Sequence, residues 1–98
     1  MKQLITTLAT TVAGAFSAEL ALDTETVITL DVKLKAGSHN NSRVVLQHSP
    51  DGNNWLPGYD STNGNGSVTV TLATTKVRAC VLRGEGSTAE ADIFITAK

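Results

Sequence analysis

The strongest constraint on the fold is an alternation of apolar and polar residues with a period of two, clearest from residue 26 to residue 35. Successive side chains of a β-strand point to opposite faces, so a half-buried strand has this period and an amphipathic helix does not. The pattern therefore predicts a strand whose apolar positions face a core. These positions are Ile28, Leu30, Val32 and Leu34.

The rest of the chain repeats this pattern in short segments. A stretch from residue 16 to residue 23 predicts a strand with four apolar positions facing inward, Phe16, Ala18, Leu20 and Leu22. Polar or Gly-rich turns separate the segments at intervals of about 8 to 12 residues, which is typical of a β-sandwich. We expect an all-β fold, a single small antiparallel β-sandwich of about seven or eight short strands, Ig-like or jelly-roll-like, in one domain spanning residues 1–98. Further strands are expected at 43–49, 54–59, 68–72, 76–83 and 89–97.

Residues 1–14 allow several interpretations. Leu4, Leu8 and Val12 fit one face of a strand, with Thr6 and Thr10 between them, but they also recur at helical spacing. The threonines favour an extended N-terminal segment, either a docking arm or an edge strand, ahead of a sandwich formed by residues 15–98. The residues expected to dock are Leu4, Thr6, Leu8, Thr10 and Val12.

The charge of the chain argues against nucleic acid as a partner. Eight basic and nine acidic residues give a formal net charge of -1, whereas nucleic-acid-binding domains usually present a basic face. Arg78 and Arg83 are therefore interpreted as solvated strand residues rather than phosphate contacts. No segment reaches the ~20 apolar residues needed to span a bilayer, so no membrane partner is expected.

Few residues could support catalysis or metal binding. His39 and His48 have no partner at a recognisable metal-ligand spacing, and no nucleophile or phosphate-binding motif is found. Cys80 is the single cysteine, so no internal disulfide can form, and its apolar neighbours predict a buried, inert thiol. We therefore expect no catalytic residue, no metal and no cofactor.

The most distinctive segment is Ser49-Pro50-Asp51-Gly52-Asn53-Asn54-Trp55. Pro50 favours a turn, Asp51 can accept hydrogen bonds from nearby backbone amides, and Gly52 can adopt a positive φ without a steric penalty. Trp55 is predicted to anchor the core with its large apolar ring system. The alternative is that Trp55 and Tyr59 are exposed and form a platform on which a sugar stacks.

This segment extends to a Val-x-Leu-Gln-x-Ser-x-Asp-Gly-x-x-Trp pattern, here Val44 to Trp55. Together with the stretch around Phe16, the late Arg78 and Cys80, and the turn at residues 86–88, the chain resembles a family of small tailed-bacteriophage structural proteins. The resemblance covers nearly the whole chain, although only the turn is specific. The longer polar loop at residues 36–42 and the Pro57-Gly58 pair depart from the pattern and leave the docking surface open.

The resemblance implies a non-enzymatic structural component of a bacteriophage virion, most directly a capsid decoration or head-associated protein. Its partners would be other virion proteins of the capsid, head or tail, and copies of itself, with a trimer slightly favoured because capsids offer three-fold positions. It would be found in the host cytoplasm before assembly and in the virion afterwards. Docking would use the N-terminal arm and strand edges.

Two other functions remain open. One is a glycan-binding or adhesion β-sandwich, on a phage fibre or a secreted protein, that uses Trp55 and Tyr59. The other is a secreted Ig-like adhesion domain, which requires the N-terminal run after Lys2 to be a signal peptide ending near Ala18. Threonines interrupt that run, so we expect it to remain part of the chain.

Overall fold

The computed structural model describes residues 1–10, 14–36, 42–56, 61–63, 65–83 and 90–98. These residues contain no helix, and hence no helix that could cross a membrane. The strands are β1 (Lys2–Ala9), β2 (Leu20–Ala21), β3 (Val27–Ala36), β4 (Arg43–Ser49), β5 (Ser61–Asn63), β6 (Gly66–Thr71), β7 (Lys76–Arg83) and β8 (Glu90–Ala97).

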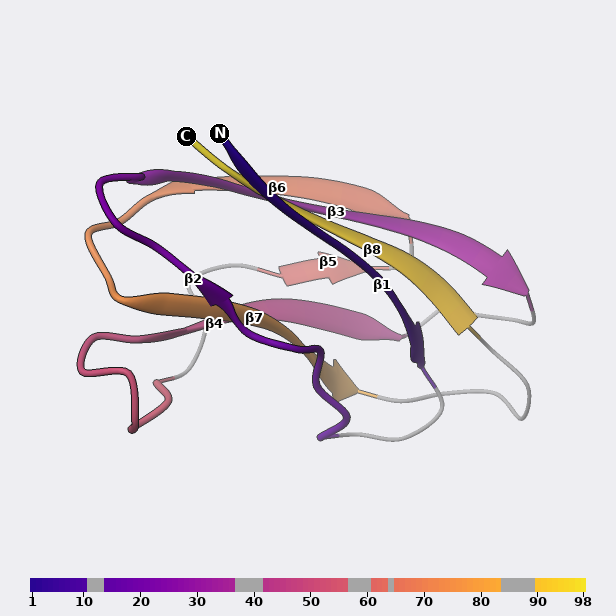
Figure 1. The fold of residues 1–98 in the computed structure, drawn as a ribbon. Coiled ribbons are helices and arrows are strands. Elements are labelled where there is room, and N and C mark those ends of the chain that lie inside the picture. Colours follow the sequence, from indigo (N-terminus) through magenta and orange to yellow (C-terminus); the bar gives the residue numbers. More distant parts are fainter. Residues whose placement is uncertain (11–13, 37–41, 57–60, 64, 84–89) are drawn as a thin grey trace.

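The strands form two four-stranded antiparallel sheets packed face to face (Figure 1). The first sheet has the order β1-β8-β3-β6 and the second the order β2-β7-β4-β5. Hydrogen-bonded pairs thus join the first strand to the last, the second to the seventh, the third to the sixth and the fourth to the fifth. This is the strand order of a jelly roll. The predicted all-β antiparallel sandwich is confirmed.

The core lies between the two sheets and is densest under the central strands. The alternation that predicted β3 is confirmed, because Ile28 and Leu30 are fully buried and Val32 is 5% exposed. Leu34, further along the strand, is partly exposed. β3 and β8 have a neighbour on either side and the second sheet beneath them, so their inward side chains lose nearly all contact with water. On β8 the fully buried isoleucines are Ile93 and Ile95.

The alternation predicted for residues 16–23 is only partly correct. Leu22 is buried as expected, but Phe16 is 58% exposed and Ser17 is buried in its place. The physical reason is a pair of hydrogen bonds to β7. The Ser17 amide donates to the Ala79 carbonyl and the Ser17 hydroxyl accepts from the Ala79 amide, both at 2.9 Å. These bonds turn Ser17 inward and Phe16 outward, and the regular strand is shortened to β2.

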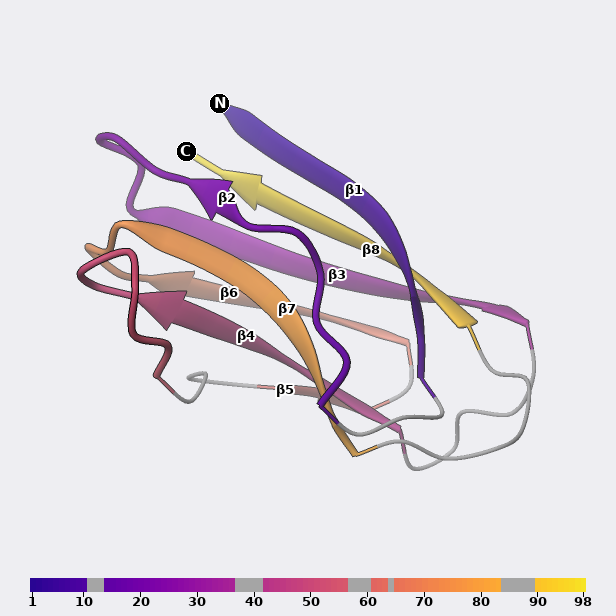
Figure 2. The same cartoon turned by 60° about the horizontal axis from the view of Figure 1, so that its bottom comes forward.

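Of the two structures predicted for the N-terminal segment, a docking arm or an edge strand, its described residues form the edge strand. β1 pairs with β8 over its whole length, from Lys2 opposite Ala97 to Ala9 opposite Glu90, at the edge of the first sheet (Figure 2). Leu8 belongs to the core and Leu4 packs against it. Thr6 points to the same face, and Thr10 is buried just beyond the strand. Val12 lies outside the described residues.

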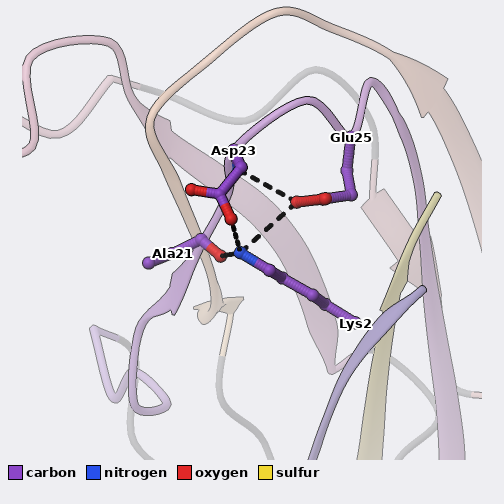
Figure 3. Close-up of polar contacts among 4 residues, drawn as sticks. All are labelled: Lys2, Ala21, Asp23 and Glu25. Carbon is purple, nitrogen blue, oxygen red and sulfur yellow. Dashed lines mark hydrogen bonds and ion pairs between the residues drawn. The ribbon is translucent and has the colours of Figure 1, made fainter.

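A polar contact ties the start of β1 to the segment that links the two sheets (Figure 3). The Lys2 ammonium donates to the Ala21 carbonyl at 3.0 Å and to the Asp23 carboxylate at 2.9 Å. It also lies 3.5 Å from Glu25. The hydrogen bond to Asp23 raises the pKa of Lys2, and the Asp23 amide lowers the pKa of Glu25. Both shifts favour the ion pair around neutral pH, so the first residues of β1 are held against β2.

Candidate functional site

The turn after β4 forms the local structure that its sequence predicts. Asp51 Oδ1 accepts hydrogen bonds from the backbone amides of Asn53 and Asn54, each at 2.8 Å, and from the Ser49 hydroxyl at 3.2 Å. Its other oxygen accepts from the Asn54 side-chain amide at 2.6 Å. Gly52 has a φ of 83°, which glycine adopts without a steric penalty. The turn is therefore closed by one carboxylate.

The same turn is fastened to the connection between β6 and β7. The Thr75 hydroxyl donates to the Pro50 carbonyl at 2.6 Å, and the Thr75 amide donates to the Ser49 carbonyl at 3.2 Å. Ser49 itself is fully buried. Because these bonds come from a segment distant in sequence, the turn keeps a fixed position relative to β7.

We expect the hydrogen bonds to Asp51 to make the turn sensitive to acid. Four donors hold the pKa of Asp51 well below its usual range, the two backbone amides contributing most. A carboxylate with a lowered folded-state pKa contributes stability above its unfolded pKa, about 3.9, and that contribution is lost as pH falls through the folded value. Asp51→Asn should lower the Tm at pH 7, by less than a core truncation does. Below pH 4 the Tm of the variant should decrease less with falling pH than the Tm of the wild type. Thermal melts between pH 7 and pH 2 measure both.

Asp23→Asn is the matched control, because the Asp23 carboxylate is 80% exposed and accepts from the flexible Lys2 ammonium rather than from backbone amides of a turn. Equal acid sensitivity in wild type and Asp51→Asn would show that Asp51 does not stabilise the turn through its charge.

Beyond the turn, the chain doubles back along β4 and directs Trp55 onto the outer face of the second sheet. The Leu56 amide donates to the His48 carbonyl at 2.9 Å, and these two residues form an isolated antiparallel bridge. Adjacent residues of an extended chain point to opposite faces. Trp55 therefore points to the face that carries Gln47, and Gln47 lies directly opposite Arg78 on β7.

Arg78 is the centre of a three-residue stack on this outer face, which we call the Phe16–Arg78–Trp55 stack. Its guanidinium carbon lies 4.1 Å from the centre of the Phe16 ring and 4.1 Å from that of the Trp55 ring. The two rings reach it from opposite neighbours of β7, since Phe16 bridges to Cys80 from the β2 side and Trp55 follows β4. Arg78 Nε also donates to Gln47 Oε1 at 2.8 Å. The arginine is thus sandwiched between two aromatic rings, an arrangement favoured by cation–π attraction.

The expected core position of Trp55 is wrong. Trp55 is half-buried and does not belong to the core cluster. The space between the sheets is filled by aliphatic side chains from both, and the bridge at Leu56 turns the tryptophan outward instead. The interpretation of Arg78 as a simply solvated residue also changes, because two rings cover its faces. Tyr59 and His39 lie outside the described residues.

The remaining candidates show no arrangement typical of catalysis within the described part of the chain. His48 is buried, with Nδ1 3.1 Å from the Thr74 hydroxyl. Cys80 is 8% exposed, and burial raises the pKa of its thiol. Among the described residues no three His, Cys, Asp or Glu side chains gather where they could hold a metal ion.

The edge of the first sheet offers a second surface. β1 is an outermost strand, and Ile5 at its middle is 61% exposed. Lys2 is the one charged residue of β1. Its ammonium group forms ion pairs with Asp23 and Glu25. Edge strands are usually protected from pairing by charges or prolines. β1 carries little protection of this kind.

Sequence reasoning missed the stack, although part of its signal was present. Gln47 stands between the buried Leu46 and His48, and Arg78 stands between the buried Val77 and Ala79, so the outward direction of both follows from the period of two. Comparison of the chain with protein-family models and with curated protein sequences gives no match.

Proposed function

We propose that this chain is a non-enzymatic structural component of a bacteriophage virion, most directly a capsid decoration or head-associated protein. One observation carries the proposal. Three of the residues on which the resemblance to tailed-phage structural proteins rests, Phe16, Trp55 and Arg78, are far apart in sequence but meet in a single stack. Residues that meet in this way form one structural unit. A chance match to the family at all three positions of one structural unit is therefore harder to accept than chance matches at three unconnected positions.

The geometry suits a building block that docks through an edge. A jelly roll is rigid because its sheets share one core. β1 presents an edge whose single charged residue, Lys2, is paired with Asp23 and Glu25, and it has an exposed Ile5 at its centre. A partner strand can add to such an edge by main-chain hydrogen bonds. The partner would be another virion protein of the capsid, head or tail, or a second copy of the chain, with a trimer slightly favoured. The chain would accumulate in the host cytoplasm and then enter the virion.

Rebinding of purified protein to particles that lack it tests the edge. Ile5→Lys places a charge on an exposed position of β1 and should weaken particle binding about tenfold, or ~1.4 kcal/mol, while leaving the fold intact. Ser67→Lys is the matched control, because it adds the same charge at an exposed position of β6, the opposite edge of the same sheet. Co-sedimentation measures the bound fraction.

If wild type binds and both variants bind equally well, β1 is not the docking edge. If wild type does not bind particles at all, the virion proposal itself fails.

A glycan-binding module is a second candidate, favoured by the position of Trp55 at the surface rather than in the core. Aromatic rings at a surface can stack on sugars, and jelly rolls occur in lectin domains as well as in capsids. This function predicts saturable binding on a glycan array that Trp55→Ala abolishes. The Arg78 guanidinium already covers one face of the Trp55 ring, which leaves less of it for a sugar.

A further inference from the structure

We propose that the Phe16–Arg78–Trp55 stack is the anchor of a protein-docking surface whose partner supplies a carboxylate, from an aspartate or glutamate flanked by apolar residues. The proposal concerns the outer face of the second sheet, not the β1 edge, and it holds whether or not the partner is a virion protein. It rests on the orientation of Arg78, on the lack of a carboxylate partner for it among the described residues, and on the apolar surface around it.

The stack fixes the direction of the guanidinium. The centres of the Phe16 and Trp55 rings each lie 4.1 Å from its central carbon, and Gln47 Oε1 accepts a hydrogen bond from its Nε at 2.8 Å. A free arginine side chain loses much rotamer freedom when it binds a partner. Here that freedom is already lost in the unbound protein, so the cost of ordering is not incurred again on binding.

The charge of Arg78 has no carboxylate partner in the described part of the chain. The ion pairs there involve Lys2, with Asp23 and Glu25, and Lys76, with Glu19. A guanidinium has five N–H donors, and one of them is used by Gln47. No described residue is shown hydrogen-bonded to the two terminal nitrogens of the guanidinium, and two parallel bonds from these nitrogens fit a carboxylate.

The surroundings indicate a protein partner rather than a polyanion. Phe16 and Leu82 are each 58% exposed, and Leu82 points to the same face as Arg78 because it lies four residues along β7. Lys76, two residues before Arg78 on β7 and on the same face, forms an ion pair with Glu19 at 3.0 Å. Nucleic acid needs several unpaired cations in a row. A single oriented arginine amid exposed apolar side chains instead resembles the centre of a protein interface, where Trp and Arg are enriched.

Two capped tripeptides that differ by one group test the chemistry directly, Ac-Leu-Glu-Leu-NH2 and Ac-Leu-Gln-Leu-NH2. Each is titrated into the whole ¹⁵N-labelled protein, and the Arg78 Nε–H and Trp55 indole N–H signals are followed by NMR. We expect saturable shifts of both signals, with the glutamate peptide binding about fivefold more tightly than the glutamine peptide, as one partly exposed ion pair allows.

Arg78→Lys keeps the charge but loses the planar fork, so it should remove the preference for glutamate. Arg43→Lys, at an exposed position of β4, is the matched control and should leave the preference unchanged. Retained signals from the core of each variant show that it is folded. Equal shifts with both peptides, or shifts that leave Arg78 and Trp55 unmoved, would overturn the proposal. Failure of this test leaves the virion proposal standing, since that proposal is tested by particle binding through β1.

Discussion

Ile95→Ala is expected to lower the free energy of unfolding by about 2–5 kcal/mol, the range found for truncation of a large buried aliphatic side chain. Ile95 is fully buried and lies between Leu4 on β1 and Leu30 on β3. Alanine there removes three carbon atoms from contact with both sheets and leaves a cavity. Because domains of this kind are stable by only about 5–15 kcal/mol, the loss should be plain in urea unfolding followed by circular dichroism.

Ile5→Ala is the matched control, since it makes the same change in the same sheet. Ile5 is 61% exposed, so its truncation should change the free energy of unfolding by about 0.5 kcal/mol or less. Similar losses at both positions would mean that Ile95 does not lie in a close-packed core and that the two sheets are not packed as described.

Removal of residues 1–9 is expected to destabilise the sandwich severely, with a fall in Tm larger than that of Ile95→Ala. The deletion takes away the whole of β1, including Leu8 of the core cluster. It also exposes the edge of β8 along a full eight-residue strand. An uncovered edge with alternating isoleucines invites pairing with other chains, so aggregation should accompany the loss of stability. Thermal melts and light scattering measure the two effects.

Removal of Met1 alone is the control, because Met1 is 85% exposed and precedes the strand. A truncated protein that melts at the wild-type temperature and stays monodisperse would show that residues 1–9 are a separable arm after all. For the same reason the Ile5→Lys variant is a sharper test of docking than a deletion, because it changes the edge and keeps β1 in place.

The period of two predicted most of the fold because it reflects a local property of strands. Ile28, Leu30 and Val32 are buried as the pattern requires. The turn at Asp51 and Gly52 was predictable for the same reason, since its hydrogen bonds join residues within three positions of one another. Local chemistry decides such features, so the sequence alone predicts them.

The surface stack could not be predicted because it depends on contacts between distant segments. Phe16 fits the apolar pattern of the strand predicted for residues 16–23, and the hydrogen bonds of Ser17 to Ala79 turn it outward. Trp55 has the large apolar side chain of a core residue. The bridge between Leu56 and His48 turns this side chain to the outer face. The partner of Lys2 likewise lies some twenty residues away, across the gap between sheets.

The fold and the proposed function stand on different grounds. A jelly roll is compatible with capsid proteins and with lectins alike, so the architecture does not choose between the two candidates. The choice rests on the meeting of Phe16, Arg78 and Trp55 at one place and on the weakly protected edge of β1. Both features belong to the outer surface, which is where a structural subunit meets its neighbours.

Electron cryomicroscopy of particles with and without the gene for this chain tests the central claim most directly. Purified wild-type particles should show density for a two-layered sandwich at symmetry-related sites on the capsid or at a head junction, and this density should vanish from particles made without the gene. Wild-type particles that contain no such density, and no peptide of the chain by mass spectrometry, would contradict the account.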